Sequence, residues 1–458
     1  MHTLITGPAS ISFPVTGPLY CPYYNQWGKD VYTRSEAFAD NPFKVLASST
    51  SGSPAIVDAA GQFFHFMTDA VEQGCEFAFN PRNPRPRNLG NLNVSQEQTL
   101  TVTIPEGQQL YHDDSGDMQT AWKKCNSLIM ASRPLLHPVQ NRPDHWDMIE
   151  YCTWVEQKRQ AGQGTPLAVL NDAFIDDYIQ RVNDMGLPKG KFTIDHGWMP
   201  GHETYGDWDV DTARFPNFEQ TIRRIADNGF VPGLWFAPVW LHQKSRIVAA
   251  HKHILGPAIA RGTVDTALGQ DPWHYWADCE DTYKLIKPVF TRYIDIGIRK
   301  FKWDMIYAEK SFMKKLHMMF YQAIKEIDPS VEVEIHQPDI FFAQYGDVIR
   351  TNDVLCNDTA DWKAVTLAHF KVCQYSSPGK VINLDHIGGN DPTVTPDRFL
   401  EHLSLYKGVA GYPVVSLLPD SISDECVDAL RTYLKEYEAS PTPVNHFYDQ
   451  DGFKQSLS

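Results

Sequence analysis

The chain has 458 residues, of which 42% are hydrophobic and 21% charged, so it is longer than one typical domain and has the composition of a globular protein. Its formal net charge of −15 argues against binding nucleic acid through the phosphates, because that requires a basic surface. The sequence has no apolar run of about 18 residues that could span a membrane and no visible signal peptide, and we therefore expect a cytoplasmic protein without membrane contacts.

The first 117 residues predict a small β-rich, sandwich-like domain. Short apolar segments such as Leu100–Ile104 alternate with Gly, Pro, Ser and Asn, which is typical of antiparallel strands and turns. The stretch 80–86 contains three prolines and cannot be a central strand, because proline lacks the N–H that a sheet requires. Residues 118–131 have a helical pattern, and we assign 118–147 as a helix and linker to a second domain.

From residue 148 onward, short apolar strands alternate with amphipathic helices, as in parallel βαβ units. The expected strands are 148–154, 191–195, 231–236, 299–304, 331–335, 348–353, 380–384 and 411–416. The expected helices are 171–184, 218–227, 281–296, 311–326, 362–373, 397–406 and 423–437. This order predicts an α/β fold, a (β/α)8 TIM barrel over residues 148–440, with a C-terminal tail at 441–458. A doubly wound open sheet is the alternative.

The C-terminal ends of these strands carry a concentration of reactive side chains. A TIM barrel assembles its active site from those ends, whereas an ordinary strand end is a turn of Gly, Asn or Ser. Here the ends carry Trp154, Asp195, His196, Trp235, Lys302, Asp304, His336, Arg350, Asp353 and Asp385. The predicted site is therefore rich in carboxylates, imidazoles, cations and indoles.

Two of these carboxylates are candidates for cleaving a glycosidic bond. A retaining glycosidase uses one carboxylate as nucleophile and a second as acid/base, about 5–5.5 Å apart, against about 6.5–9.5 Å for an inverting pair. Asp304 and Asp353 end the fourth and sixth strands, and we predict Asp304 as nucleophile and Asp353 as acid/base. Asp353 must then be protonated in the first step. Either aspartate could instead cap the next helix, and Asp358 and Asp361 compete for the acid role.

Three further strand-end residues have two interpretations each. Lys302 points to the same face as Asp304, because strand side chains alternate, and it either keeps the nucleophile ionised and binds hydroxyls or forms a buried structural ion pair. Arg350 either binds hydroxyls or holds a neighbouring carboxylate. Asp385 either lines the same pocket or belongs to a turn that caps a helix.

Several motifs resemble glycoside hydrolase family 36, the bacterial-type α-galactosidases. Phe301–Met305 resembles the Lys-Trp-Asp-Met nucleophile motif, and Ile194–Trp198 resembles the Asp-Asp-Gly-Trp strand end. Similar segments follow at Gly206–Asp211, Arg214–Pro216, Gly233–Trp235 and Arg350–Asp353, so the resemblance covers about residues 148–440 in the correct order.

The resemblance implies a retaining α-glycosidase that acts on terminal α-linked sugars, with α-galactosides as the default substrate. By this likeness Asp304 is the nucleophile, Asp353 is the acid/base, and Asp195, Trp235 and Lys302 contact the sugar. The position of their strand ends adds further candidate substrate contacts, namely His196, His336, Arg350, Trp154 and Asp385. No metal or organic cofactor is expected, and a homo-oligomer is possible.

The chain also departs from the family pattern. Family members have two adjacent aspartates, which read the 4- and 6-hydroxyls of galactose, where this chain has Asp195 and His196. A histidine cannot reproduce a bidentate carboxylate. Residues 236–239 replace Glu-Pro-Glu, and residues 334–338 replace a Cys-Ser-x-Gly-Gly-Gly segment. N-acetylgalactosamine, glucose-type and arabinopyranose units therefore stay open beside galactose.

Two other functions are compatible with these residues. A transglycosidase of the raffinose-synthase type would use the same two carboxylates and differ in how it excludes water. A non-catalytic carbohydrate-binding protein on a degenerate barrel would bind sugar without turnover. The aromatic run Trp273–Trp276 fits core packing better than a sugar platform, and the loop residues His202, Glu203 and Tyr205 fit substrate contact and simple loop polarity equally well.

Overall fold

The structure is a computed structural model of the chain. It describes residues 2–15, 19–20, 55–59, 62–68, 76–81, 98–104, 106, 109–113, 142–258, 273–305, 310–336, 343, 345–350, 362–363, 366–367, 370, 373, 377 and 379–444.

Eight parallel strands close into a barrel, as the sequence predicted. They are β9 (Glu150–Cys152), β10 (Lys191–Ile194), β11 (Val231–Phe236), β15 (Lys300–Trp303), β16 (Glu332–Ile335), β17 (Val348–Arg350), β18 (Val381–His386) and β19 (Tyr412–Val415). The last strand pairs with the first, with Val414 opposite Glu150, and this contact closes the sheet. The alternative of an open doubly wound sheet was therefore wrong, since an open sheet has two unpaired edges.

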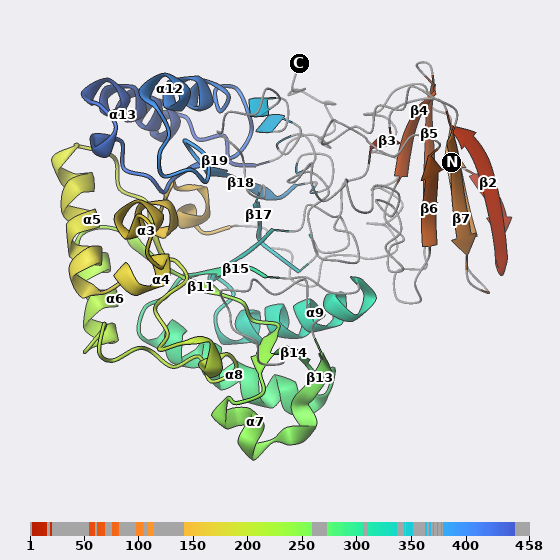
Figure 1. Ribbon diagram of the computed structural model, residues 1–458, viewed down its shortest axis with the longest axis horizontal. Coiled ribbons are helices and arrows are strands. Elements are labelled where there is room, and N and C mark those ends of the chain that lie inside the picture. Colours follow the sequence, from red (N-terminus) through yellow and green to blue (C-terminus); the bar gives the residue numbers. More distant parts are fainter. Residues whose placement is uncertain are drawn as a thin grey trace.

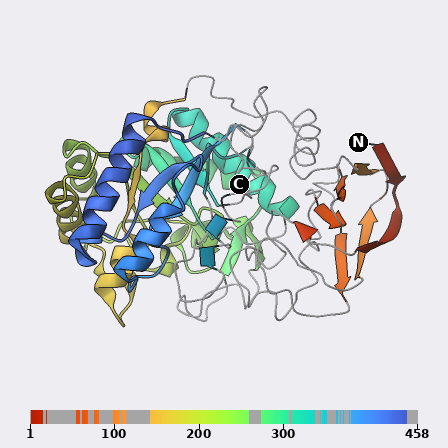
Figure 2. The same ribbon diagram turned by 90° about the horizontal axis from the view of Figure 1, so that it is seen from above.

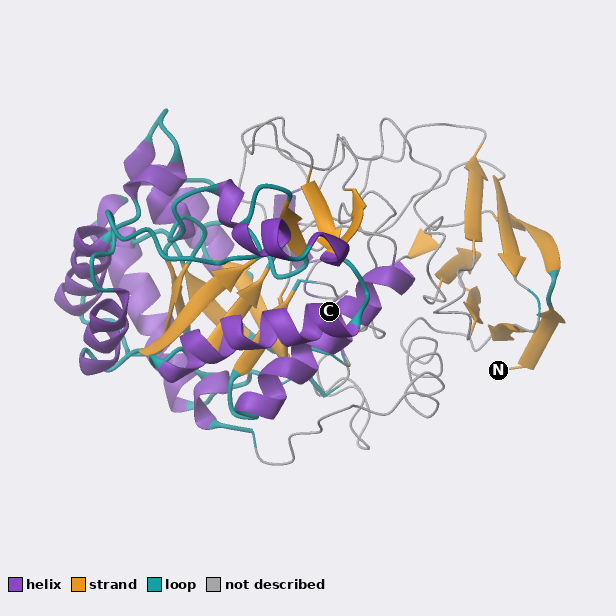
Figure 3. Cartoon of the chain, turned by 90° about the horizontal axis from the view of Figure 1, so that it is seen from below, coloured by secondary structure: helices purple, strands orange, loops and turns teal. Residues whose placement is uncertain are grey.

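Helices cover the outside of the barrel (Figures 1 and 3). They are α3 (Trp154–Ala161), α4 (Pro166–Val169), α5 (Asp172–Asp184), α6 (Phe218–Asp227), α8 (Glu280–Asp295), α9 (Lys310–Ile327), α12 (Pro396–Ser404) and α13 (Asp424–Ala439). Polar caps define where several of them begin: the side chains of Asn171, Asn217 and Ser423 accept the first free backbone N–H groups of α5, α6 and α13. None of the helices in the described ranges is long and apolar enough to cross a membrane.

An insertion that the sequence analysis did not predict follows β11. It forms a small antiparallel sheet of β12 (Trp240–His242), β13 (Leu255–Ala258) and β14 (Trp273–Trp276), together with the short helix α7 (Arg246–Ala250). In Figure 1 this insertion lies at the lower edge of the molecule beside α8. Trp273, Tyr275 and Trp276 are buried there, which agrees with the expected core packing of this aromatic run.

The described regular elements of the N-terminal part are all β-strands (red and orange in Figures 1 and 2). One sheet joins β1 (His2–Thr6), β8 (Gln109–Asp113), β5 (Gln62–Thr68), β4 (Ala55–Ala59) and β3 (Leu19–Tyr20). A second joins β2 (Ala9–Val15), β7 (Gln98–Ile104) and β6 (Glu76–Pro81), and the proline-bearing β6 lies at its edge.

The domain boundaries stay a prediction. The expected helix 118–131 lies outside the described residues. Half of the expected helix 362–373 is described, and its described residues 362–363, 366–367, 370 and 373 are helical. Within the expected tail, Val444 forms a β-bridge with Val381, and the carbonyl oxygens of Thr442 and Pro443 accept backbone hydrogen bonds from residues of the barrel.

Charged side chains fill the interior of the barrel at the N-terminal ends of its strands, where TIM barrels usually place branched apolar residues. We call this group the inner cluster: Glu150, Lys191, Lys300, Glu332 and Tyr412. Nζ of Lys191 lies 3.0 Å from Oε2 of Glu332, and Lys300 pairs with Glu150. The Tyr412 hydroxyl lies 3.1 Å from Oε2 of Glu150. Every side chain of the cluster is buried. Each charge is therefore compensated by an oppositely charged partner within the barrel and not by water.

Candidate active site

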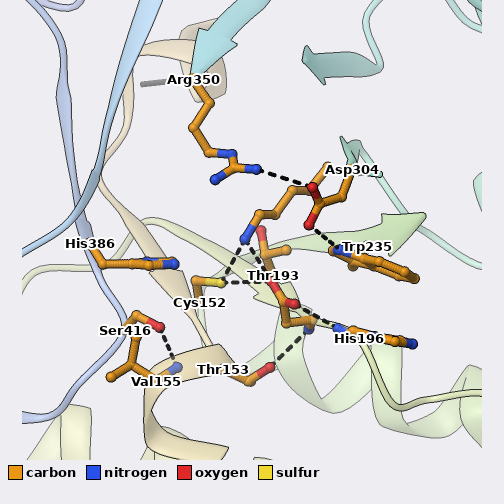
Figure 4. A network of polar contacts seen from close by, with 12 residues as sticks. Cys152, Thr153, Val155, Thr193, His196, Trp235, Asp304, Arg350, His386 and Ser416 are labelled. Atoms are coloured by element: carbon orange, nitrogen blue, oxygen red, sulfur yellow. Dashed lines mark hydrogen bonds and ion pairs between the residues drawn. The ribbon is translucent and has the colours of Figure 1, made fainter. Parts of the chain in front are cut away.

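The predicted site residues that the structure describes meet at the C-terminal mouth of the barrel. Inward-facing positions alternate along each strand, and the last inward position of several strands holds a polar or aromatic side chain. Figure 4 views this mouth, with Asp304 between Arg350 and Trp235. We call Asp195, Lys302, Asp304, His336 and Arg350 the mouth cluster.

Asp304 follows the last residue of β15, and its side chain is 27% exposed. Oδ1 lies 2.9 Å from Nδ1 of His336 and accepts the backbone N–H of Met305 at 2.8 Å. Nη2 of Arg350 lies 3.6 Å from the same oxygen. Oδ2 accepts the indole N–H of Trp235 at 3.1 Å. Donors from three strands therefore converge on one carboxylate that water can still reach.

These contacts favour the ionised form of Asp304. Burial would raise the pKa of this carboxyl. The electrostatic interaction and hydrogen bond with His336, together with the positive charges of Arg350 and Lys302, outweigh burial and hold its pKa well below the ordinary value. An ionised, partly exposed carboxylate is what a nucleophile at neutral pH requires.

Lys302 forms a buried ion pair rather than a direct contact with Asp304. Its Nζ lies 2.7 Å from Oδ2 of Asp195, and the thiol of Cys152 donates to the same oxygen at 3.1 Å. Burial would lower the pKa of Lys302, but the charge of Asp195 raises it well above the ordinary value. Oδ1 of Asp195 accepts the backbone N–H of His196 at 2.7 Å. Both oxygens of Asp195 therefore already have donors from the protein.

His196 packs under Trp235 (Figure 4). The two rings are stacked, with centroids 4.2 Å apart and an interplanar angle of 14°, and Trp154 stacks more distantly on His196 at 6.5 Å. Nε2 of His196 lies 2.7 Å from the hydroxyl of Tyr205. Burial, together with the charge of His202, lowers the pKa of His196 to about 3, so this ring is neutral where the family pattern has a carboxylate.

Arg350 is shared among three carboxylates. Nε lies 3.2 Å from Oε1 of Glu334, Nη1 lies 3.7 Å from Oδ1 of Asp385, and Nη2 faces Asp304. Of its two expected roles, this geometry matches the holding of neighbouring carboxylates. Glu334 also accepts from Lys300 at 2.5 Å and thereby joins the inner cluster to the mouth.

The backbone beside the site is strained at two residues that are not glycine. Met305 and Asp385 have φ angles of 54° and 60°, the left-handed region that side chains disfavour. Such strain costs about 1–3 kcal/mol per residue and concentrates at functional sites. At Met305 the turn aims the backbone N–H at Oδ1 of Asp304.

The expected acid/base could not be placed. Asp353, Asp358 and Asp361 all lie in 351–361, outside the described residues, so the separation of the two carboxyl groups stays open. The structure places the other candidates at the mouth or beside it: Trp154, Asp195, His196, Trp235, Lys302, Asp304, His336, Arg350 and Asp385.

Sequence reasoning missed two participants. Cys152 was not among the predicted site residues, and Glu334 was considered only as part of a departure from the family pattern. Glu334 lies opposite Lys302 in the register of β15 and β16, and Sγ of Cys152 lies 3.5 Å from Nζ of Lys302. The alternation along β9 and β16 was the signal that could have identified them.

The loop after β10 belongs to a packed aromatic group. Tyr205 is buried between Trp208, at a centroid distance of 4.7 Å, and Trp273, at 4.9 Å. His202 lies at the same junction, 6.0 Å from the ring of Trp273. This packing fixes Tyr205 and through it the orientation of His196.

No protein-family model matches the chain. Among solved structures, it is similar to the α-galactosidase from Thermus thermophilus in complex with p-nitrophenyl α-D-galactopyranoside, with 13% identity, a TM-score of 0.62 and coverage of 93% of this chain and 87% of the other. The α-galactosidase from Lactobacillus brevis gives 13% identity, a TM-score of 0.58 and coverage of 97% and 63%. An α-xylosidase of family 31 from a soil metagenome, complexed with xylose, gives 13% identity and a TM-score of 0.60. This match covers 94% of this chain and 64% of the other.

At these identities the comparisons establish the fold. The chain resembles family 36 α-galactosidases in its barrel, as the motifs indicated, and it spans about 63% of the length of the Lactobacillus brevis enzyme.

Proposed function

We propose that this chain is a retaining α-glycosidase, with α-galactosides as the default substrates. The observation that carries the proposal is the state of Asp304: an ionised carboxylate at the barrel mouth, 27% exposed and surrounded by His336, Arg350 and Trp235. The structural similarity to α-galactosidases and an α-xylosidase supports the α-linked class.

The reaction would proceed by double displacement. Asp304 attacks the anomeric carbon while the bond to the leaving oxygen breaks, and Asp353 gives that oxygen its proton. A water molecule then attacks the same carbon, the ester bond to Asp304 breaks, and Asp353 accepts the proton of the water. The low pKa of Asp304 suits both roles of this residue, as nucleophile in the first step and as leaving group in the second.

The sugar that occupies the site is the least constrained part of the proposal. The neutral ring of His196 replaces the second carboxylate of the family pattern, and it is turned toward Trp235 and Tyr205. A sugar hydroxyl would meet Asp195 only by sharing it with Lys302 and Cys152. Seven of the expected sugar contacts are therefore proposals to be tested by substitution: Trp154, Asp195, His196, Trp235, Lys302, Arg350 and Asp385. The eighth, His336, lies against the proposed nucleophile Asp304.

The first experiment is the release of p-nitrophenol from a panel of α- and β-linked p-nitrophenyl glycosides, including galactose, N-acetylgalactosamine, glucose, xylose and arabinopyranose. Turnover of an α-linked sugar that disappears in Asp304→Ala is expected, and proton NMR of the first product should show an α-anomer. Addition of azide to Asp304→Ala should yield a β-glycosyl azide, because the small anion takes the place of the missing nucleophile.

Other outcomes favour other functions. A first product with the β-configuration would contradict retention. Disaccharide formation in preference to hydrolysis, after addition of an acceptor sugar, would favour a transglycosidase. Sugar binding in calorimetry without any turnover would favour a carbohydrate-binding protein, and turnover that persists in Asp304→Ala would overturn the assignment of the nucleophile.

A further inference from the structure

His336 occupies the position after β16 where the family pattern has a Cys-Ser-x-Gly-Gly-Gly segment, and its contacts indicate a role that differs from sugar binding. The ring is fully buried, and Nδ1 lies 2.9 Å from Oδ1 of Asp304. A side chain that water cannot reach and that faces the nucleophile is poorly placed to bind a sugar hydroxyl.

The two oxygens of Asp304 have unequal numbers of donors. A carboxylate oxygen has about two lone-pair positions. On Oδ1 both are filled, by the N–H of Met305 at 2.8 Å and by His336 at 2.9 Å. In the described part of the chain, Oδ2 accepts one hydrogen bond, from Trp235 at 3.1 Å. Figure 4 shows the two oxygens turned to opposite sides, one toward Arg350 and the other toward Trp235. Oδ2 therefore retains a lone pair for an electrophile.

Arg350 does not replace His336 in this arrangement. Its guanidinium also faces Glu334 at 3.2 Å and Asp385 at 3.7 Å, and its distance to Oδ1 of Asp304 is 3.6 Å, which is too long for a good hydrogen bond. Nη2 of Arg350 lies 3.1 Å from Nδ1 of His336 and could only donate to it. Nδ1 cannot accept this bond and also donate to Asp304. The contact with Oδ1 of Asp304 is shorter, at 2.9 Å, and a hydrogen bond from His336 contributes to the lowered pKa of Asp304, so we assign the proton of Nδ1 to the side of Asp304.

We propose that His336 is a positioning residue for the nucleophile: it holds Oδ1 of Asp304 so that Oδ2 is the oxygen that attacks the anomeric carbon. The proposal rests on the proposed function for the attack itself. The charged and titratable groups around His336 are Asp304, Arg350, the neighbouring Glu334 and the buried His317 of α9, which interacts with it electrostatically.

Three substitutions of His336 test whether the rate depends on a donor at the position of Nδ1 or only on a side chain that fills the space. In His336→Asn the amide nitrogen replaces Nδ1, in His336→Gln it replaces Nε2, and His336→Ala removes the donor. We expect His336→Asn to keep kcat within about tenfold of the wild type, and the other two to lose about 100-fold or more, the size of one lost donor at a charged oxygen in an active site. KM should change little, because no sugar contact is removed.

The choice of substrate distinguishes the nucleophile from the acid. An α-glycosyl fluoride needs no acid catalysis, because fluoride is a good leaving group, whereas a methyl α-glycoside depends on the acid. A defect in the nucleophile therefore lowers kcat for both substrates alike. Equal losses in His336→Ala are expected. A loss confined to the methyl glycoside, or a rise in KM at unchanged kcat, would overturn the proposal, as would equal activity of the Asn and Gln variants.

A second measurement needs no turnover and so separates this inference from the proposed function. In protein labelled with [γ-13C]aspartate, the Asp304 signal is the one missing from Asp304→Asn. The pKa of Asp304 should rise by about one pH unit or more in His336→Ala. An unchanged pKa of Asp304 would contradict the role of His336 even in an active enzyme. If the pKa shifts but the protein is inactive on every glycoside, the contact between His336 and Asp304 is supported and only the proposed glycosidase activity is rejected.

Discussion

The inner cluster and the mouth cluster contain the same kinds of side chains in the same barrel, but their surroundings differ. In the inner cluster Lys191, Glu332 and Lys300 are 0% exposed and Glu150 is 1% exposed, and each charge has a partner of opposite sign. In the mouth cluster Asp304 is 27% exposed, and among the described residues its Oδ2 accepts a single hydrogen bond, from Trp235. Charge alone therefore does not identify a reactive site. An accessible and incompletely paired group is what distinguishes the mouth.

The strongest test of this difference is Asp304→Asn. The amide keeps the shape of the side chain but cannot act as a nucleophile, so kcat/KM should fall at least about 1000-fold, equivalent to about 4 kcal/mol. Because the group is partly exposed, its loss should cost less folding stability than loss of an inner charge. The measurements are kcat/KM on the best glycoside and unfolding in urea. A small effect on activity would place the chemistry elsewhere.

Lys191→Met should have the opposite effect and lower stability more than activity. It leaves Glu332 buried without its closest cation, which typically costs about 3–5 kcal/mol of unfolding free energy. The double variant Lys191→Met/Glu332→Leu removes both charges and should recover part of this loss. Urea denaturation checks both proteins. Equal stability of the single variant and the wild type would mean that the inner cluster is not maintained by this pair.

The free energy of unfolding should fall at acid pH, because two buried histidines are neutral in the folded protein. Burial lowers the pKa of His196 to about 3 and that of His317 to about 3. The unfolded chain binds these protons near pH 6.5 and the folded chain does not, so stability is full above pH 6.5 and falls between about pH 6.5 and 3, by about 1.4 kcal/mol per pH unit for each ring.

The measurement is the slope of the unfolding free energy against pH from pH 7 to 4, for the wild type and for His196→Asn. His196→Asn should reduce this slope, because it removes one of the two buried rings. A wild-type stability that does not vary over this range would argue against neutral buried rings.

The smallest effect is expected from Trp235→Phe. An aromatic ring that can stack on His196 is kept, while the N–H donor to Oδ2 of Asp304 is lost together with the pyrrole ring. One such bond to a charged group is worth about 1.5 kcal/mol or more, so kcat/KM should fall about tenfold. Trp276→Phe is the matched control, because within the described residues its buried indole N–H has no partner. Equal losses in both variants would indicate a packing effect.

Most of the barrel was predictable from local patterns. The predicted strands 191–195, 231–236 and 299–304 agree with β10, β11 and β15 to within a residue at either end. Short apolar runs that alternate with amphipathic helices typically form a parallel sheet covered by helices, and eight such units close into a barrel. The insertion with β12–β14 was not predicted. Its strands are short, and its aromatic residues pack in the core without the alternation that indicates a half-buried strand.

The side chains at the barrel mouth, apart from the undescribed Asp353, were predictable as a group but not as pairs. The alternation rule placed Lys302 on the same face as Asp304, yet its partner is Asp195 from the second strand. The sequence did not predict that His336 lies against Asp304. Which neighbour a long side chain reaches depends on the tilt and stagger of strands from distant parts of the chain, and no local pattern contains that information.

The sequence by itself determined the kind of fold and the strand ends that carry chemistry, because hydrophobic periodicity and strand alternation are local properties of the chain. Only the tertiary structure decided which charges neutralise one another and which stay available. It paired Lys302 with Asp195, divided Arg350 among three carboxylates and placed His336 at Oδ1 of Asp304. The energies of such pairs depend on distance and burial, and both arise only when the eight strands close.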